Sequence, residues 1–158
     1  MNWKNLLAAA VITTFMAISS NAAEPSQDAV DKAELQKFQG SWVMADAEMD
    51  GKKVQEKHVK KSRITFTGNK VQLTTPHQHR KKIVAIMTKL DPSKKPGEMQ
   101  WVRNTGPNKG KTMTAIYEFE GPDQYKVSFD SSMKETPKQF GTKAGSGHIW
   151  HTWKRVKK

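Results

Sequence analysis

The chain has 158 residues, enough for one domain, with 27 Lys and Arg against 15 Asp and Glu and a formal net charge of +12. It contains no cysteine, which excludes disulfide bonds and the lipid-modified cysteine that tethers bacterial lipoproteins. The basic balance favours an anionic partner, for example an acidic polymer. Because the lysines are spread over many turns, they are also compatible with a role in solubility alone, and we do not expect nucleic acid to be the main partner.

The first 23 residues have the three parts of an export signal. Lys4 supplies the positive start, Leu6 to Ile18 form a short apolar run, and Ser20 to Ala23 form a small-residue cleavage site. We therefore expect residues 1–23 to be a signal peptide and the mature protein to be periplasmic or secreted, without a membrane anchor.

A short helix is predicted between Asp28 and Phe38, where apolar residues recur at roughly helical spacing. We therefore divide the mature chain into residues 24–34, a polar tether with the start of this helix, and residues 35–158, a single β-barrel domain. Gly40 ends the helix. Trp42 then opens the first strand with an indole large enough to plug one end of a small barrel.

After Gly40 the chain alternates between short period-two segments and turn-forming pairs such as Asp50-Gly51 and Gly68-Asn69. In the first strand, Trp42, Met44 and Asp46 are expected to share one face. The eight predicted strands are Ser41–Glu48, Ser62–Thr67, a segment around Val71 and Leu73, Ile83–Leu90, a segment around Met99, Trp101 and Arg103, Thr112–Glu120, a segment around Tyr125, Val127 and Phe129, and His148–Val156.

Two longer connections separate these strands. Lys52–Lys61 is charged and is expected to be a loop or a single helical turn, and Ser131–Gly147 is expected to be a long polar loop. Eight strands at short, regular spacing without a sequence repeat predict an all-β, up-and-down antiparallel barrel. The interior of such a barrel holds either side chains or one small ligand.

Several short motifs occur in order over nearly the whole mature chain. They are Leu35-Gln36, Gly40-Ser41-Trp42, Asp50-Gly51-Lys52-Lys53-Val54, Ile64-Thr65-Phe66-Thr67-Gly68-Asn69-Lys70, Leu90-Asp91-Pro92-Ser93-Lys94-Lys95-Pro96, Gly110-Lys111-Thr112 and Ala115-Ile116-Tyr117-Glu118. In order and spacing they resemble the uncharacterised lipocalin-like domain family that is abundant in planctomycete bacteria. The resemblance implies an exported lipocalin-like barrel with no established activity or ligand. It also implies that a basic residue of the last strand, here Arg155, packs over Trp42 of the first through a cation–π contact.

Candidate ligand contacts are aromatic or basic. Trp101, Met113 and Tyr117 are expected to face the interior, where they either line a cavity or fill it. Trp150 and Trp153 lie on opposite faces of the last strand, so at least one of them must point outward or lie under the N-terminal helix. The basic residues that we expect around an open rim, as candidates for anion binding, are Lys52, Lys53, Arg80, Lys81 and Lys82.

Histidines give a second hypothesis, metal binding. His77 and His79 have the i, i+2 spacing that places two imidazoles on one side of an extended segment. His148 and His151 fall on opposite faces of a regular strand. Solvated loop histidines that bind no metal are the alternative, and we assign no metal ligand.

No catalytic residue or cofactor is predicted. Asp46 and Glu48 share a strand face without any sign of acid–base coupling. The segment Gly106–Thr112 has Thr105 where a phosphate-binding loop needs glycine, and it leads into a strand, so it is read as a hairpin turn. We therefore expect a monomeric, non-enzymatic barrel that binds a small amphipathic or anionic ligand, or else a surface module that binds acidic polymers through basic loops.

Overall fold

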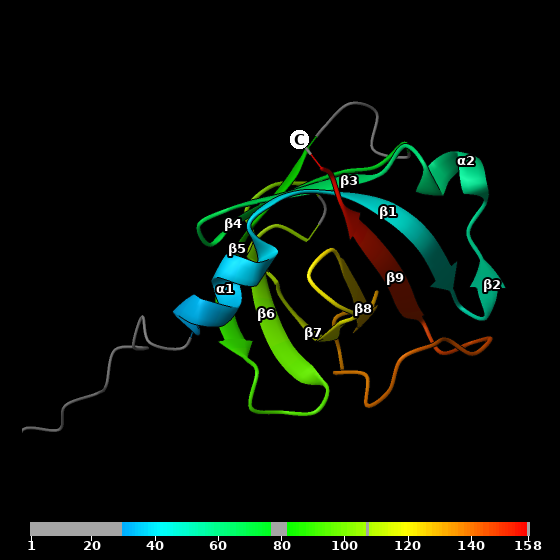
Figure 1. The fold of residues 1–158 in the computed structure, drawn as a ribbon. Helices are drawn as coiled ribbons and strands as arrows, with labels where there is room; N and C mark the ends of the chain where they lie inside the picture. Colours follow the sequence, from blue (N-terminus) through cyan, green and yellow to red (C-terminus); the bar gives the residue numbers. More distant parts are fainter. Residues whose placement is uncertain (1–29, 77–81, 107, 158) are drawn as a thin grey trace, which may run out of the picture.

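Figure 1 shows a computed structural model of the chain, which describes residues 30–76, 82–106 and 108–157. The strands form one antiparallel sheet in the order β2-β1-β3-β4-β5-β6-β7-β8-β9. β1 also pairs with β9, so eight strands close into a barrel, and the short β2 only extends one end of β1. The prediction of an all-β, eight-stranded antiparallel up-and-down barrel is confirmed.

The observed elements lie within a few residues of the predicted ones. Residues 52–61 contain β2 and one helical turn, and no helix or strand occurs in residues 131–147. The helices are α1 (Lys32–Phe38) and α2 (Glu56–Val59), and the strands are β1 (Gly40–Met49), β2 (Lys52–Lys53), β3 (Arg63–Thr67), β4 (Lys70–Thr74), β5 (Ile83–Asp91), β6 (Gly97–Arg103), β7 (Thr112–Phe119), β8 (Gln124–Asp130) and β9 (His148–Arg155).

Helix α1 begins later than its apolar spacing suggests. Asp31 is the N-cap, and its side chain accepts a hydrogen bond of 2.8 Å from the Glu34 backbone N–H. Val30, just before the cap, forms a parallel bridge with Leu90 of β5. The chain is therefore fixed to the barrel before the helix starts, and α1 begins at Lys32 instead of Asp28.

α1 and a cluster of aromatic side chains close one end of the barrel. Phe38, Trp42 and Tyr125 are fully buried, and Trp153 is 1% exposed. The Trp42 indole donates a hydrogen bond of 2.7 Å to the Phe38 carbonyl, and its ring centre lies 4.8 Å from that of Tyr125 in an edge-to-face arrangement. Solvent is therefore excluded from this end.

Arg155 joins the last strand to the closed end. Its guanidinium carbon lies 4.1 Å from the centre of the Trp42 ring. The same guanidinium donates hydrogen bonds of 2.6 and 2.7 Å to the carbonyls of Gln39 and Lys37, groups at the end of α1 that have no partner within a helix. Gly40 has a φ of +99°, in the region that favours glycine, which lets the chain turn from α1 into β1 beside Arg155.

The prediction that Asp46 shares a face with Trp42 and Met44 is wrong. The pairing of β1 with β9 shifts between Met44 and Asp46, so Ala45 forms a β-bulge. The bulge reverses the alternation and brings Ala47 into the core, where it is 1% exposed. Asp46 then lies outside the barrel, where it pairs with Lys53.

Replacing Arg155 with methionine should destabilise the protein. The substitution removes the hydrogen bonds to the α1 carbonyls and the contact with the Trp42 ring, so we expect the free energy of unfolding to fall by about 2 kcal/mol. Urea unfolding followed by tryptophan fluorescence measures this change. Lys154→Met, at the exposed neighbouring position, should change it by less than about 0.5 kcal/mol. Equal losses in the two variants would contradict a specific role for Arg155.

Candidate ligand-binding cavity

A cavity lies inside the barrel toward the end opposite α1, where β6 ends and β7 begins. Its wall is mostly aliphatic or aromatic, with Arg103 and His151 as the ionisable residues. The cavity volume is ≈ 50 Å³, which is room for a few water molecules and well below the roughly 300 Å³ at which drug-sized pockets begin. Side chains therefore fill most of the interior, and even a single-ring ligand requires small movements of the wall.

Arg103 is the last residue of β6 and shares the inward face with Trp101. Burial lowers the pKa of the guanidinium, but an arginine remains charged at neutral pH. Because the group has lost part of its water, an anion in the cavity is attracted to it more strongly than to an exposed lysine. A guanidinium is suited to carboxylate ligands, because its N–H groups form charge-assisted hydrogen bonds with them.

His151 lies in the cavity wall on β9, between two aromatic rings. Its ring centre is 5.4 Å from that of Phe129 and 5.7 Å from that of Trp153, and both contacts are edge-to-face. Burial lowers the pKa of the imidazole to about 4, so the ring is neutral at pH 7 and carries one donor and one acceptor. No residue in the described part of the chain forms a hydrogen bond with its ring nitrogens.

Trp101 adds another polar group to this region. The residue lines the cavity and is 8% exposed. Its indole N–H is buried without a hydrogen-bond partner among the described residues. A buried donor of this kind is uncommon in folded proteins, because losing its bond to water costs about 1–3 kcal/mol when nothing replaces it. The indole N–H of Trp101 and the ring nitrogens of His151 are therefore polar groups near the cavity that have no hydrogen-bond partner among the described residues.

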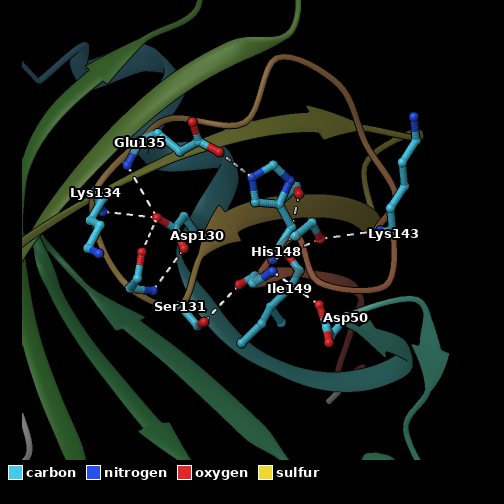
Figure 2. A network of polar contacts seen from close by, with 12 residues as sticks. Asp50, Asp130, Ser131, Lys134, Glu135, Lys143, His148 and Ile149 are labelled. Carbon is cyan, nitrogen blue, oxygen red and sulfur yellow. Dashed lines mark hydrogen bonds and ion pairs between the residues drawn. The ribbon is translucent and has the colours of Figure 1, made fainter.

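The loop between β8 and β9, residues 131–147, contributes Met133 to the cavity wall. Met133 has a φ of +59°, in the left-handed region that a methionine rarely adopts. Asp130 holds this turn, because its carboxylate accepts hydrogen bonds from the backbone N–H groups of Ser132 (2.8 Å), Lys134 (2.9 Å) and Glu135 (3.3 Å) (Figure 2). Burial alone would raise the pKa of Asp130, but these bonds and that from the Ser132 hydroxyl outweigh it and hold the pKa at about 2.

The far end of the same loop is fixed to neighbouring elements, as Figure 2 shows. His148 lies 2.9 Å from the Glu135 carboxylate. The Gly147 N–H donates to Asp50 at 3.1 Å, and the Ser131 hydroxyl donates to the Gly147 carbonyl at 2.7 Å. Met133 is therefore held over the cavity by a loop that is tied down at both of its ends.

The structure separates the residues that were expected to contact a ligand. Trp101 and Met113 line the cavity, whereas Tyr117 lies at the closed end, where its hydroxyl donates to Glu34 at 3.2 Å. Burial and the nearby carboxylate raise the pKa of Tyr117. The predicted split of the last-strand tryptophans is confirmed: Trp153 belongs to the core, and Trp150 lies outside it with the Lys53 ammonium 5.4 Å from its ring centre.

The basic residues expected at the rim are not gathered at the cavity. Lys52 and Lys53 are exposed on β2, where Lys53 pairs with Asp46. Lys82 is exposed just before β5, and its carbonyl accepts a bond of 3.2 Å from the Thr105 hydroxyl. Arg80 and Lys81 lie outside the described residues. The described cation that does line the cavity is Arg103.

The histidine predictions have different outcomes. His77 and His79 lie outside the described residues, and His148 and His151 are separated, one in the loop network and the other in the cavity. No group of three or more His, Cys, Asp or Glu residues within the described ranges could hold a metal ion.

The importance of three cavity residues was not apparent from the sequence. Arg103 could have been found from its i, i+2 relation to Trp101, since both point inward. His151 was considered only as a metal ligand. Met133 belongs to an irregular loop, and the sequence of that loop has no pattern that predicts a residue inside the barrel.

Comparisons with protein-family models, with curated proteins and with solved structures find no match for this chain. The geometry of the cavity and the sequence are therefore the basis for any functional proposal. In the part of the chain that the structure describes, neither helix has the length and apolar character needed to span a membrane.

Burial of His151 should make stability depend on pH in weak acid. The fold lowers the pKa of this ring from 6.5 to about 4, so the unfolded chain binds the proton more readily. The free energy of unfolding should therefore fall as the pH drops from about 6.5 to about 4, by up to about 3 kcal/mol. Urea unfolding across this range measures the fall, and His151→Phe should reduce it by more than half, leaving the smaller contribution of carboxylates near pH 4. His58→Phe, on α2, should retain it, and an unchanged profile in the His151 variant would contradict the assignment. The fold lowers the pKa of Asp130 from 3.8 to about 2, so this carboxyl reduces stability mainly between these two pH values.

Asp130→Asn should loosen the loop over the cavity. The substitution places an amide N–H₂ where backbone N–H groups need an acceptor, so the closed loop loses stability. We expect trypsin to cleave after Lys134 or Lys138 at least about tenfold faster, as monitored by mass spectrometry. Asp91→Asn alters a similar turn, in which Asp91 accepts from Ser93, and should leave the cleavage unchanged. Equal rates in the two variants would show that Asp130 does not hold the loop.

Proposed function

We propose that this chain is an exported, non-enzymatic binding protein that belongs to the lipocalin-like family named above and acts as a monomer. Its barrel binds a small amphipathic ligand with an anionic group. The apolar body of the ligand occupies the cavity, and the anionic group meets Arg103.

The observation that carries this proposal is the position of Arg103 in the wall of an otherwise mostly apolar cavity. Binding sites for small molecules typically combine apolar walls with a few polar groups that fix the orientation of the ligand. A partly buried guanidinium at the end of a strand is suited to a carboxylate. The closed end, filled by Trp42, Phe38 and Tyr125, leaves the end near Arg103 as the side from which a ligand enters.

The size of the cavity restricts the ligand further. At ≈ 50 Å³, the space does not admit a long lipid chain unless the wall rearranges extensively. Because the loop of Met133 is held at both ends, enlargement of the cavity depends on side-chain rotation, for which the flexible Met133 side chain is suited. We therefore assign a ligand of one ring or a short chain.

A surface that binds acidic polymers is the competing proposal. Several described lysines already have carboxylate partners, including Lys53 with Asp46 and Lys94 with Glu98, which lowers their attraction for a polymer. Salt separates the two proposals, because polymer binding weakens steeply with ionic strength, whereas a ligand inside the barrel is screened less. Metal binding through His77 and His79 is a third proposal, and alanine at both positions would abolish it.

Arg103→Met should weaken the binding of a small carboxylate. Hexanoate and its methyl ester present the same chain with and without charge, and isothermal titration calorimetry measures both affinities. We expect hexanoate to bind more tightly than the ester to the unmodified protein. The Arg103 variant should lose at least about tenfold in hexanoate affinity and little in ester affinity, because one charge-assisted interaction is removed.

Arg63→Met is the matched control for this experiment. Arg63 is the first residue of β3 and is exposed, so its loss changes the net charge equally without touching the cavity. Hexanoate affinity should remain unchanged in this variant. Equal effects of the two substitutions, or no preference for hexanoate over its ester, would contradict the proposed function.

A further inference from the structure

The imidazole of His151 is, with Arg103, one of two ionisable side chains in the wall of an otherwise mostly apolar cavity. Its ring is flanked by Phe129 and Trp153, both of which would pack equally well against a phenylalanine. No described residue bonds to its nitrogens. Within the described part of the chain, the ring nitrogens are therefore available to a molecule that enters the cavity.

The position of the ring points to a ligand. His151 and Arg103 are both in the cavity wall. Arg103 is the last residue of β6, near the rim of the barrel. His151 lies within β9, where it pairs with Val127 of β8. The cavity therefore presents a charged group at its rim and a neutral imidazole within it. Trp101 also lines the cavity, and its indole N–H has no hydrogen-bond partner among the described residues.

We propose that His151 is a second recognition group, which bonds to a hydroxyl on the apolar body of the ligand. This inference rests on the proposed function and narrows it. The ligand class becomes a small hydroxylated carboxylic acid, with one ring or a short chain, whose carboxylate meets Arg103 and whose hydroxyl meets His151.

The neutral state of the ring is essential to this role. Because burial lowers the pKa of His151 to about 4, one ring nitrogen is an acceptor at neutral pH. A hydroxyl that enters the cavity loses its bonds to water, and the imidazole nitrogen replaces one of them. The site therefore discriminates between a hydroxylated compound and its apolar analogue of the same shape.

The test compares phenol with toluene, which have the same ring and differ by a hydroxyl and a methyl group. Calorimetric titration of the full chain gives the ratio of their affinities. His151→Phe retains a ring between Phe129 and Trp153 but removes both nitrogens. We expect the preference for phenol relative to toluene to fall at least about tenfold in this variant, which is the effect of one buried hydrogen bond. His58→Phe should leave the ratio unchanged.

Benzoate and 4-hydroxybenzoate test the two groups together. The hydroxyl should raise the affinity of the acid in the unmodified protein, and His151→Phe should remove this gain while the dependence on Arg103 remains. The ¹⁵N NMR signals of the His151 ring supply a measurement that needs no variant, because they should shift when phenol binds and remain in place when toluene binds.

The outcomes distinguish this inference from the function on which it rests. If toluene and benzoate bind but the phenol-to-toluene ratio is the same in both proteins, the role of His151 is overturned and the cavity remains a binding site. If none of these compounds binds, both proposals are overturned. A ring signal that is unmoved by bound phenol would also overturn the role of His151.

Discussion

The closure of β1 against β9 is the constraint on which the rest of the structure depends. It removes the free edges of the sheet and sets Trp42 opposite Arg155. From there the guanidinium reaches the Trp42 ring and the carbonyls at the end of α1. Strand closure and helix docking are thus coupled through one side chain. Because α1 and the aromatic residues beneath it fill this end, the interior space that remains lies toward the other end.

That remaining space is small, and its polar groups are unusual for a barrel core. A filled interior that served stability alone would be best built from apolar side chains, since polar groups lose bonds to water when they are buried. This barrel instead places Arg103 and His151 in the wall and holds Met133 beside them in a left-handed conformation. Asp130 and the contacts of His148 and Gly147 stabilise that loop. Polar groups in the cavity wall, together with an adjacent loop that is fixed by hydrogen bonds, are features of a binding site. They are the reason that we propose a small acid as the ligand.

The architecture could be predicted from the sequence because period-two segments and glycine turns report local structure. Inward-facing residues could be identified in the same way, including Trp101, Met113 and Tyr117. The position of each of these residues along the barrel axis could not be predicted, because it depends on the tilt and stagger of the strands in the closed barrel. Tyr117 therefore lies at the closed end and not at the cavity. The bulge at Ala45 reversed the faces of Asp46 and Ala47, since it arises from pairing with a strand about a hundred residues away in sequence. The entry of Met133 into the cavity depends on the tertiary path of an irregular loop, which has no periodic signal.

Native mass spectrometry of the protein purified from its own host tests the central claim most directly, because it needs no choice of probe. If the barrel carries a small acid, the folded protein should show one additional mass of a small organic molecule. That mass should disappear on denaturation and be absent from Arg103→Met but present in Arg63→Met. A bare protein in every case, or an increment that corresponds to a metal ion, would contradict the account of this barrel as a carrier of small acids.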